Sequence, residues 1–150
     1  SRLVAKPMID IEHIEGLYDN LGEQHRCPLV RTIEKPLVMS FCEISQDNSK
    51  IHNPDTADFV VPGNLLISLL PSMLQSGLKI RHYKQCKTTS LSNARFYQSV
   101  GLGQALVLDY RLIKLRRVHQ NFFLQVEMCL RTLDTEQRVL TIGQTDYYEL

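Results

Sequence analysis

Apolar residues recur with a helical period in the first half of this chain and alternate with polar residues in the second half. The first helical stretch covers residues 8–21, and Gly22 is a plausible stop. Residues 23–31 follow as a connecting segment. A second helix is expected to start after Thr32, a candidate N-cap, and to run through Ser45. The face that predicts the first helix consists of Ile11, Ile14, Leu17, Tyr18 and Leu21.

The most apolar helix candidate spans residues 63–76 and has little polar surface, so it is expected to be buried. Gly63 opens it and Gly77 closes it. Pro71 lies inside and is expected to kink the helix, because one backbone hydrogen bond is lost there. The preceding residues 46–58 are polar and are expected to form a loop. The apolar side chains of the helix are Leu65, Leu66, Leu69, Leu70, Met73 and Leu74.

The second half of the chain predicts a run of strands. Apolar residues occupy alternate positions most clearly from Leu106 to Leu112 and from Leu124 to Leu130. Three of the strands are long and consecutive, which favours an antiparallel meander. A buried helix followed by such strands predicts an α+β fold, with the sheet wrapped around the helix. The expected strands cover residues 78–86, 93–99, 104–115, 120–132 and 137–148.

Size and composition are those of one globular domain, residues 1–150, with 43% hydrophobic and 22% charged residues. The net charge of +1 is spread along the chain, so no footprint for nucleic acid is visible. The densest basic cluster, residues 111–117, is expected to be a solvated strand end. The longest apolar run, Leu65 to Leu70, is too short to span a bilayer.

Four cysteines are scattered without a C-x-x-C pair or a zinc-like spacing to histidine. We therefore expect reduced thiols, no metal and a cytoplasmic protein. The beginning of the chain lacks the basic-then-apolar pattern of a signal peptide. Because it starts at Ser1 and not at methionine, a trimmed or altered terminus is expected.

The chemistry-bearing residues gather in and just after the polar loop. Asp47 and His52 lie five residues apart, and Gly63 then opens the apolar helix. An acid, a base and a helix N-terminus are the parts needed to polarise a thioester carbonyl and move a proton beside it. Taken alone, however, a loop histidine is more often solvated than catalytic, and a loop aspartate is often a turn or cap residue.

Flanking residues make the motif more specific. Phe41, Ser45, Asp47, Ile51 and His52 match, offset for offset, a motif that reads F-x-x-x-S-G-D-x-N-P-I-H-x-D-P-x-x-A, and Ala57 lies one position before its alanine. The sequence thereby resembles the MaoC-like hotdog-fold dehydratases, close to the (R)-specific enoyl-CoA hydratases. Residues 65–74, with their mid-helix proline, are similar to the NodN-like branch of that family. Residues 93–103 and 146–148 also resemble family segments, so the resemblance runs from about residue 11 to the end.

The chain departs from the family pattern at several positions. Gln46 replaces the glycine before the acid, and Ser49-Lys50 replace Asn-Pro. The helix opens with Val61-Pro62-Gly63 instead of A-H-G, and the stretch before it is shorter. These changes leave the acid and the base in place and alter the wall of the pocket, which bears on substrate identity.

The resemblance implies a hotdog enzyme, an (R)-specific enoyl-thioester hydratase or 3-hydroxyacyl-thioester dehydratase. Its catalytic residues would be Asp47 and His52, and the N–H groups of Gly63 and Asn64 would bind the thioester oxygen. Its substrate would be a thioester of CoA or acyl-carrier protein, with no metal or redox cofactor. The residues expected to line the substrate pocket are Ser49, Leu66, Leu69 and Leu70.

Two other functions stay open from the sequence. A hotdog thioesterase would hydrolyse the same thioester with water attacking the carbonyl. A non-catalytic acyl-binding protein would keep the fold without the reaction. For any of them, hotdog subunits usually pair, so we expect a homodimer whose sheets join into one, with the pocket at or near the interface.

Overall fold

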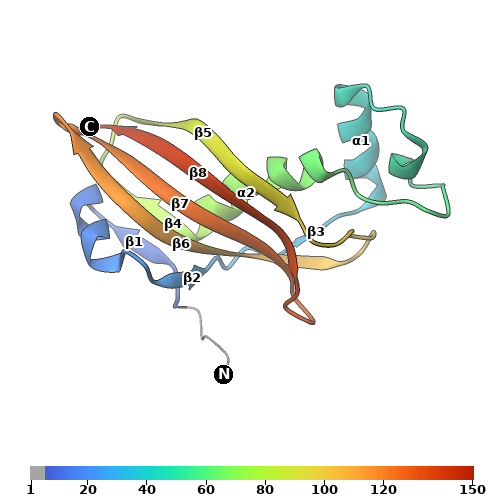
Figure 1. The fold of residues 1–150 in the computed structure, drawn as a ribbon, viewed down its shortest axis with the longest axis horizontal. Coiled ribbons are helices and arrows are strands. Elements are labelled where there is room, and N and C mark those ends of the chain that lie inside the picture. The colour runs from blue at the N-terminus through green and yellow to red at the C-terminus, as the bar shows by residue number, and fades with distance from the viewer. Residues whose placement is uncertain (1–5) are drawn as a thin grey trace.

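The computed structural model describes residues 6–150, which form one long sheet, one central helix and a projection at one end of the sheet (Figure 1). In chain order the elements are β1 (Ile9–Ile11), the 3₁₀ helix η1 (Ile14–Asn20), β2 (Gln24–Arg26), β3 (Arg31–Thr32), α1 (Lys35–Ser45), the 3₁₀ turn η2 (Lys50–His52), α2 (Gly63–Gly77), β4 (Leu78–Ile80), β5 (Gln85–Phe96), β6 (Ala105–Val118), β7 (Asn121–Thr132) and β8 (Arg138–Glu149).

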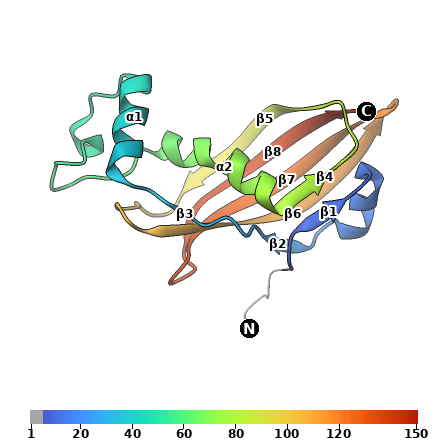
Figure 2. The ribbon, with the colours of Figure 1, turned by 180° about the vertical axis from the view of Figure 1, so that it is seen from behind.

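The main sheet is antiparallel and has the strand order β2-β6-β7-β8-β5, with β3 also paired to β6. Strands β6, β7 and β8 form the expected meander. Helix α2 lies across one face of this sheet, as the view from behind shows (Figure 2). A separate two-stranded parallel sheet joins β1 to β4. The α+β layout with a central apolar helix, expected from the sequence, is confirmed.

Burial explains why α2 sits in the centre. The helix is apolar on most of its circumference, so only a position covered by the sheet removes those side chains from water. The hydroxyl of Tyr110 on β6 donates a hydrogen bond to the carbonyl of Gly77, which ties the end of the helix to the sheet. The buried residues of α2 are Leu65, Leu66, Leu69, Leu70, Met73, Leu74 and Gly77.

Strand β5 differs from the sequence-based prediction. The expected strands 78–86 and 93–99 are divided and bounded wrongly: the structure has the short β4 and then one strand, Gln85–Phe96. Every residue of β5 is exposed, and the strand forms an edge of the sheet. An edge strand with no buried face needs no alternation of apolar and polar residues, so periodicity could not find it.

The N-terminal segment also differs. The helix expected over residues 8–21 is wrong in its first half, because Ile9–Ile11 form a strand beside β4. Only Ile14–Asn20 are helical, and they form a 3₁₀ helix. Residues 23–31 contain β2, which pairs with β6, besides connecting segments. Thr32 is not an N-cap; it lies in β3, and Glu34 holds the N-cap position of α1 without a side-chain hydrogen bond.

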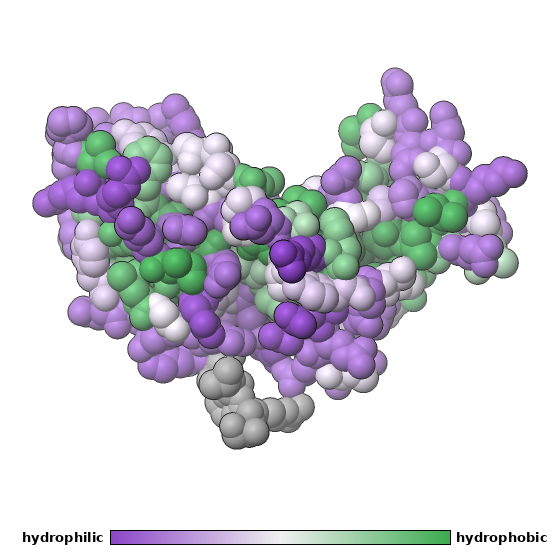
Figure 3. Space-filling view, viewed as in Figure 1, coloured by the Kyte–Doolittle hydropathy of each residue, from purple (hydrophilic) through white to green (hydrophobic). Residues whose placement is uncertain are grey.

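Helix α1 and its following loop project from the end of the sheet. Among the residues of α1, only Val38 is buried, and Ile44 is 84% exposed. The space-filling view shows this projection separated from the sheet by a notch, with apolar residues on both sides of the notch (Figure 3). The loop that carries the candidate chemistry therefore lies outside the main core and next to the N-terminal end of α2.

Candidate active site

The side chains of Asp47 and His52 meet in the loop that follows α1. Nδ1 of His52 lies 2.6 Å from Oδ2 of Asp47. Because an ionised carboxylate only accepts, the proton of this hydrogen bond belongs to Nδ1. That assignment leaves Nε2 of His52 free to take or give a proton. The two side chains are about four-fifths buried, so the pair is partly shielded and still reachable.

The end of α1 fixes the position of Asp47. Gln46 adopts a left-handed conformation with φ of 56°, and the N–H of Asp47 donates to the carbonyl of Cys42 at 3.0 Å. Glycine suits this conformation, whereas other residues adopt it at a cost of about 1–2 kcal/mol. The left-handed backbone at this position therefore explains why the motif has a glycine there. Gln46 keeps the same turn at an energetic cost and leaves the acid in place.

The polar loop is held by contacts to its neighbours. The thiol of Cys42 donates to the carbonyl of His52 at 3.7 Å, and the N–H of Val60 donates to the carbonyl of Ile51 at 2.7 Å. Lys35 pairs with Asp55 across the loop at 2.7 Å. These contacts bring His52 back toward the segment that enters α2.

Hydrogen bonds lower the pKa of the candidate acid. The N–H of Ser49 donates to Oδ1 of Asp47 at 2.8 Å, while His52 occupies Oδ2. These bonds, led by that from Ser49, lower the pKa of Asp47 to about 2. Both carboxylate oxygens are thus engaged in stabilising the charged form, which makes Asp47 better suited to orienting His52 than to donating a proton.

A titration tests this electrostatic assignment. We expect the side-chain carboxyl of Asp47 to titrate near pH 2, below the ordinary 3.8, when followed by carbon NMR. A lowered native pKa means that its contribution to stability is present above pH 3.8 and is lost as the pH falls toward 2. His52→Gln is expected to raise this pKa only in part, since Ser49 still donates. Titration of Asp47 at 3.8 or above would contradict the assignment.

His52 lines a cavity of about 540 Å³ at the N-terminal end of α2. Gly63, Asn64 and Leu66 line the same cavity from the helix, and Val60 and Val61 from the segment before it. The N–H of Val61 donates to the carbonyl of Val100 at 3.1 Å, which fixes this segment against the chain that follows β5. The cavity therefore brings together the imidazole and the first residues of the buried helix.

The start of α2 offers unused hydrogen-bond donors. Pro62 is the N-cap residue, and no side chain among residues 6–150 caps this end. The first N–H groups of a helix lack intrahelical partners and lie at the positive end of its dipole. The N–H groups of Gly63 and Asn64 are consequently suited to bind a carbonyl or an enolate oxygen.

Phe96 contributes a wall that the sequence did not indicate. It is the last residue of β5, and its ring lies over Gly63: a Cβ atom on Gly63 would be 2.7 Å from Cζ of Phe96. The absence of a side chain at Gly63 thus admits this half-exposed ring. Tyr97, Gln98 and Ser99 continue the same wall. No spacing rule links residue 63 with residue 96, so only the folded chain reveals the contact.

The remaining candidate pocket residues lie elsewhere. Ser49 touches the acid through its backbone N–H, and it does not line the cavity. Leu69 and Leu70 lie further along α2 and are buried in the core, without lining the cavity of His52. Leu66 alone of the predicted leucines reaches it.

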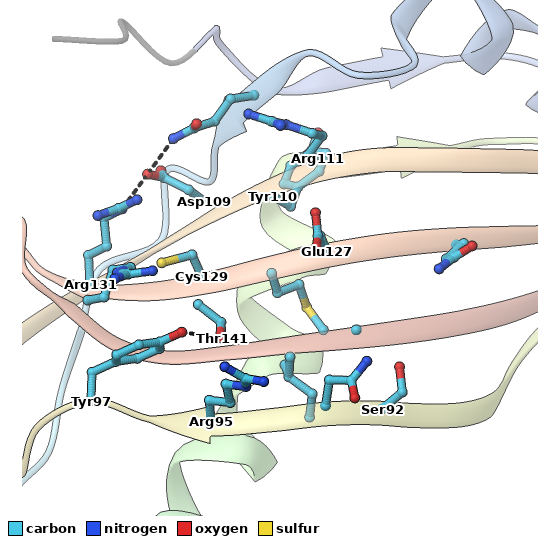
Figure 4. A pocket seen from close by; sticks show the side chains of 17 residues that line it. Ser92, Arg95, Tyr97, Asp109, Tyr110, Arg111, Glu127, Cys129, Arg131 and Thr141 are labelled. Carbon is cyan, nitrogen blue, oxygen red and sulfur yellow. Dashed lines mark hydrogen bonds and ion pairs between the residues drawn. The ribbon is translucent and has the colours of Figure 1, made fainter. Parts of the chain in front are cut away.

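A larger hollow of about 640 Å³ lies on the other face of the sheet (Figure 4). Its central acid, Asp109, is buried and accepts from Arg26 at 2.8 Å, Arg131 at 3.2 Å and Gln24 at 3.1 Å. Tyr97 hydrogen-bonds Thr141 at 3.3 Å, and Arg138 stacks on the ring of Tyr97. Asp109, Arg131 and Tyr97 thus already have protein partners, so we interpret this hollow as a charged surface network.

No protein-family model and no curated protein matches the sequence. Solved structures do match. A monoamine oxidase regulatory protein from Archaeoglobus fulgidus has a TM-score of 0.74 at 15% identity, over 95% of this chain and 99% of that chain. The (R)-hydratase from A. caviae involved in PHA biosynthesis has a TM-score of 0.65 at 20% identity, over 87% and 96%.

A MaoC-like dehydratase from Rhodospirillum rubrum matches with a TM-score of 0.73 at 10% identity, over 92% of this chain and 97% of that chain. This chain has the MaoC-like hotdog fold. The fold predicted from the motif and the strand run is confirmed, whereas the NodN-like branch stays a prediction. Similarity at these identities concerns the fold alone.

Two further findings concern the described part of this hotdog domain. Within residues 6–150, no group of three or more His, Cys, Asp or Glu residues is arranged to hold a metal ion. None of the helices in that range combines the length and the apolar character needed to cross a membrane.

Proposed function

We propose that this MaoC-like hotdog protein is an enoyl-thioester hydratase. With the same groups it would catalyse the reverse reaction, the dehydration of 3-hydroxyacyl thioesters. The observation that carries the proposal is that His52, hydrogen-bonded to Asp47, lines the cavity where α2 begins. Structural similarity to an (R)-hydratase and to a MaoC-like dehydratase supports the hydro-lyase class. Substrates would be thioesters of CoA or acyl-carrier protein, without a metal or redox cofactor, in the cytoplasm.

The reaction adds the two parts of water across the conjugated double bond. Nε2 of His52 takes one proton from water while the water oxygen bonds to the β-carbon. Electrons move into the thioester carbonyl, and the enolate oxygen accepts from the N–H groups of Gly63 and Asn64. The imidazolium of His52 then returns its proton to the α-carbon. Asp47 holds the imidazole in the required tautomer throughout.

Gly63 and Phe96 define how the substrate reaches these donors. Because the ring of Phe96 lies over Gly63, the thioester would approach along the side of the ring, toward Asn64. A loss of one oxyanion donor costs other enzymes about 3–4 kcal/mol of transition-state stabilisation. The donors at the start of α2 would thus rival the acid–base pair in importance.

Crotonyl-CoA distinguishes the candidate functions. A hydratase consumes the enoyl absorbance without releasing thiol, and a thioesterase releases free CoA thiol. A non-catalytic acyl-binding protein does neither and tolerates Asp47→Asn and His52→Gln in cells. We expect loss of the enoyl absorbance, with formation of the (R)-3-hydroxy product on chiral analysis. Thiol release alone, or no turnover of any enoyl thioester, would overturn the proposal.

The edge strand β5 supports a homodimer. It is long, exposed along its whole length and apolar at Leu91 and Phe96. Unpaired edge strands readily pair with another chain, and a two-fold axis would place two copies of β5 antiparallel. The dimer would then have one continuous sheet, and the end of β5 that carries Phe96 would bring the cavity of His52 close to the interface.

Mass in solution tests this dimer. The wild-type chain is expected to scatter light as two 17.3 kDa subunits at micromolar concentration. Leu91→Lys places a charge in the middle of β5 and is expected to weaken association at least 10-fold. Ile113→Lys, at a similarly exposed apolar residue on β6, is the matched control and should leave the mass unchanged. A monomeric wild-type protein would refute the dimer.

A further inference from the structure

A separate cavity of about 430 Å³ lies beside the C-terminal half of α2, against strands β4, β5 and β8. It shares no lining residue with the cavity of His52. Pro71 and Leu74 line it from the helix, and Leu78 and Ile80 from β4. The walls from α2 and β4 are therefore largely apolar, yet the cavity is also lined by a carboxyl group.

That carboxyl group belongs to Asp146 on β8. The side chain faces α2, in register with the buried Gln144 and Tyr148, and Asp146 is only 4% exposed. Burial raises its pKa above the ordinary value for aspartate. Charged residues are rarely buried in this way unless they are paired, and no cation pairs with Asp146 among residues 6–150.

The hydrogen bonds of Asp146 leave acceptors unused. Thr88 donates its hydroxyl to Oδ1 at 2.8 Å, and Nε2 of Gln144 is shared between Oδ1 at 2.9 Å and Oδ2 at 3.0 Å. Oδ2 thus has only a shared donor, although a carboxylate oxygen can accept two hydrogen bonds. The side-chain carbonyl of Gln144 accepts from no residue in the described range. Both Asp146 and Gln144 line the cavity, so the cavity wall carries acceptor oxygens with unused capacity.

Charge and wall chemistry select the class of ligand. Two acceptors in the cavity wall disfavour a carboxylate or a phosphate, which would bring more negative charge. Lys79 also lines the cavity and disfavours a cation, and the apolar walls make an ammonium group expensive to bury. A neutral hydroxyl group supplies a donor to these acceptors at the lowest desolvation cost.

Aromatic residues complete the pocket. Tyr83 packs edge-on against Tyr148, with ring centroids 5.1 Å apart, and both rings line the cavity. Tyr83 is partly exposed, whereas Tyr148 is buried, so the pair runs from the rim inward. Such a wall accommodates an alkyl chain behind the hydroxyl.

We propose that this cavity is a binding site for a neutral amphiphile, in which the ligand's hydroxyl group donates to Asp146 and its alkyl part packs on α2 and the Tyr83–Tyr148 wall. The site lies outside the candidate active site and would act as a second ligand site of the hotdog domain. Its readout is binding, which does not depend on whether crotonyl-CoA is turned over.

The test is a titration of the whole chain with 1-hexanol, followed by amide NMR shifts. We expect saturable shifts at Thr88, Gln144 and Asp146, with hexanoate at least 10-fold weaker. Asp146→Leu should weaken hexanol binding at least 10-fold, whereas Asp146→Asn, which keeps an acceptor and the side-chain shape, should retain most of it. The Asn variant keeps the test valid even where the Leu variant fails to fold.

Thr145→Val is the matched control, because Thr145 neighbours Asp146 on β8 and its side chain leaves the sheet on the opposite face. It should bind 1-hexanol like the wild type. Shifts that map to the other face of the sheet, equal binding by Asp146→Leu, or tighter binding of hexylamine or hexanoate than of hexanol would each overturn the proposal.

Discussion

Replacement of His52 by glutamine is expected to lower the hydration rate of crotonyl-CoA by about 10²–10⁴-fold, the usual contribution of a positioned acid–base group. Glutamine approximates the length of the side chain but cannot take a proton from water. His52 lies on the projecting loop and not in the main core. The fold and its melting temperature should therefore remain close to those of the wild type.

Asp47→Asn tests the same machinery through the tautomer of His52. An asparagine would present its amide donor to Nδ1, which would place the imidazole proton on Nε2, where the base is needed. We expect a loss of about 10²-fold or more in turnover, with little change in KM, because the substrate-binding donors of α2 are untouched. The pH profile should change together with the rate.

Two controls separate a catalytic effect from a structural one. His82→Gln removes a histidine that pairs with Glu12 at 2.8 Å, outside the cavity of His52, and should leave the rate unchanged. Circular dichroism melting should show that the His52 and Asp47 variants fold. A folded His52→Gln protein that keeps more than a tenth of wild-type turnover would remove the imidazole from the mechanism.

The sequence predicted best those elements whose burial leaves a periodic pattern. Helix α2 has core on most sides, and strands β6 to β8 have one face on it, so their apolar residues recur at regular intervals. The expected starts and ends of these four elements lie within three residues of the observed ones. The local spacing of apolar residues is therefore enough to predict a helix or strand when one of its faces is buried.

Elements defined by partners distant in sequence were not predictable in the same way. Residues 9–11 form a strand because residues 78–80 lie beside them, and a spacing of i, i+3 fits a 3₁₀ turn as well as an α-helix. Strand β5 is held by β8 along one edge, and none of its residues is buried. Pairing between segments that are distant in sequence determines these strands, and the period of apolar residues along the chain carries no information about such pairing.

The candidate site divides along the same line. The contact between Asp47 and His52 spans five residues of one loop, and a motif over that loop could predict it. The contact of Phe96 with Gly63 joins two residues from different elements, and no local feature of the sequence predicts it. Asp146 illustrates the same limit: it stood in a segment that resembled a closing strand, while its burial against α2 appears only in the fold.

Gly77→Ala is expected to be the most destabilising single methyl addition in the chain, with a loss of about 3 kcal/mol in the free energy of unfolding, at the upper end of the range for overpacked cores. The sequence suggested Gly77 as the residue that closes the helix, a position where glycine often adopts a positive φ. The structure gives another reason: positive φ values occur among the described glycines at Gly22 and Gly103 and not at Gly77.

Close packing explains the glycine. A Cβ atom on Gly77 would lie 2.5 Å from Sγ and 2.9 Å from the backbone Cα of Cys27. Truncation of Cys27 could relieve the first clash but not the second, so Cys27→Ala should rescue Gly77→Ala only in part. The backbone of either α2 or the Cys27 segment must move, and movement there also strains the hydrogen bond from Tyr110 to the Gly77 carbonyl.

Gly101→Ala provides the matched control, because a Cβ atom there meets nothing within 4 Å and its φ is not positive. It should change the free energy of unfolding by less than about 0.5 kcal/mol in urea denaturation, the usual range for surface substitutions. If Gly77→Ala were equally mild, the end of α2 would have room to shift away from Cys27. The position of α2 against the sheet would then be less rigid than its close packing on Cys27 indicates. The shapes of the two cavities that α2 lines would vary with it.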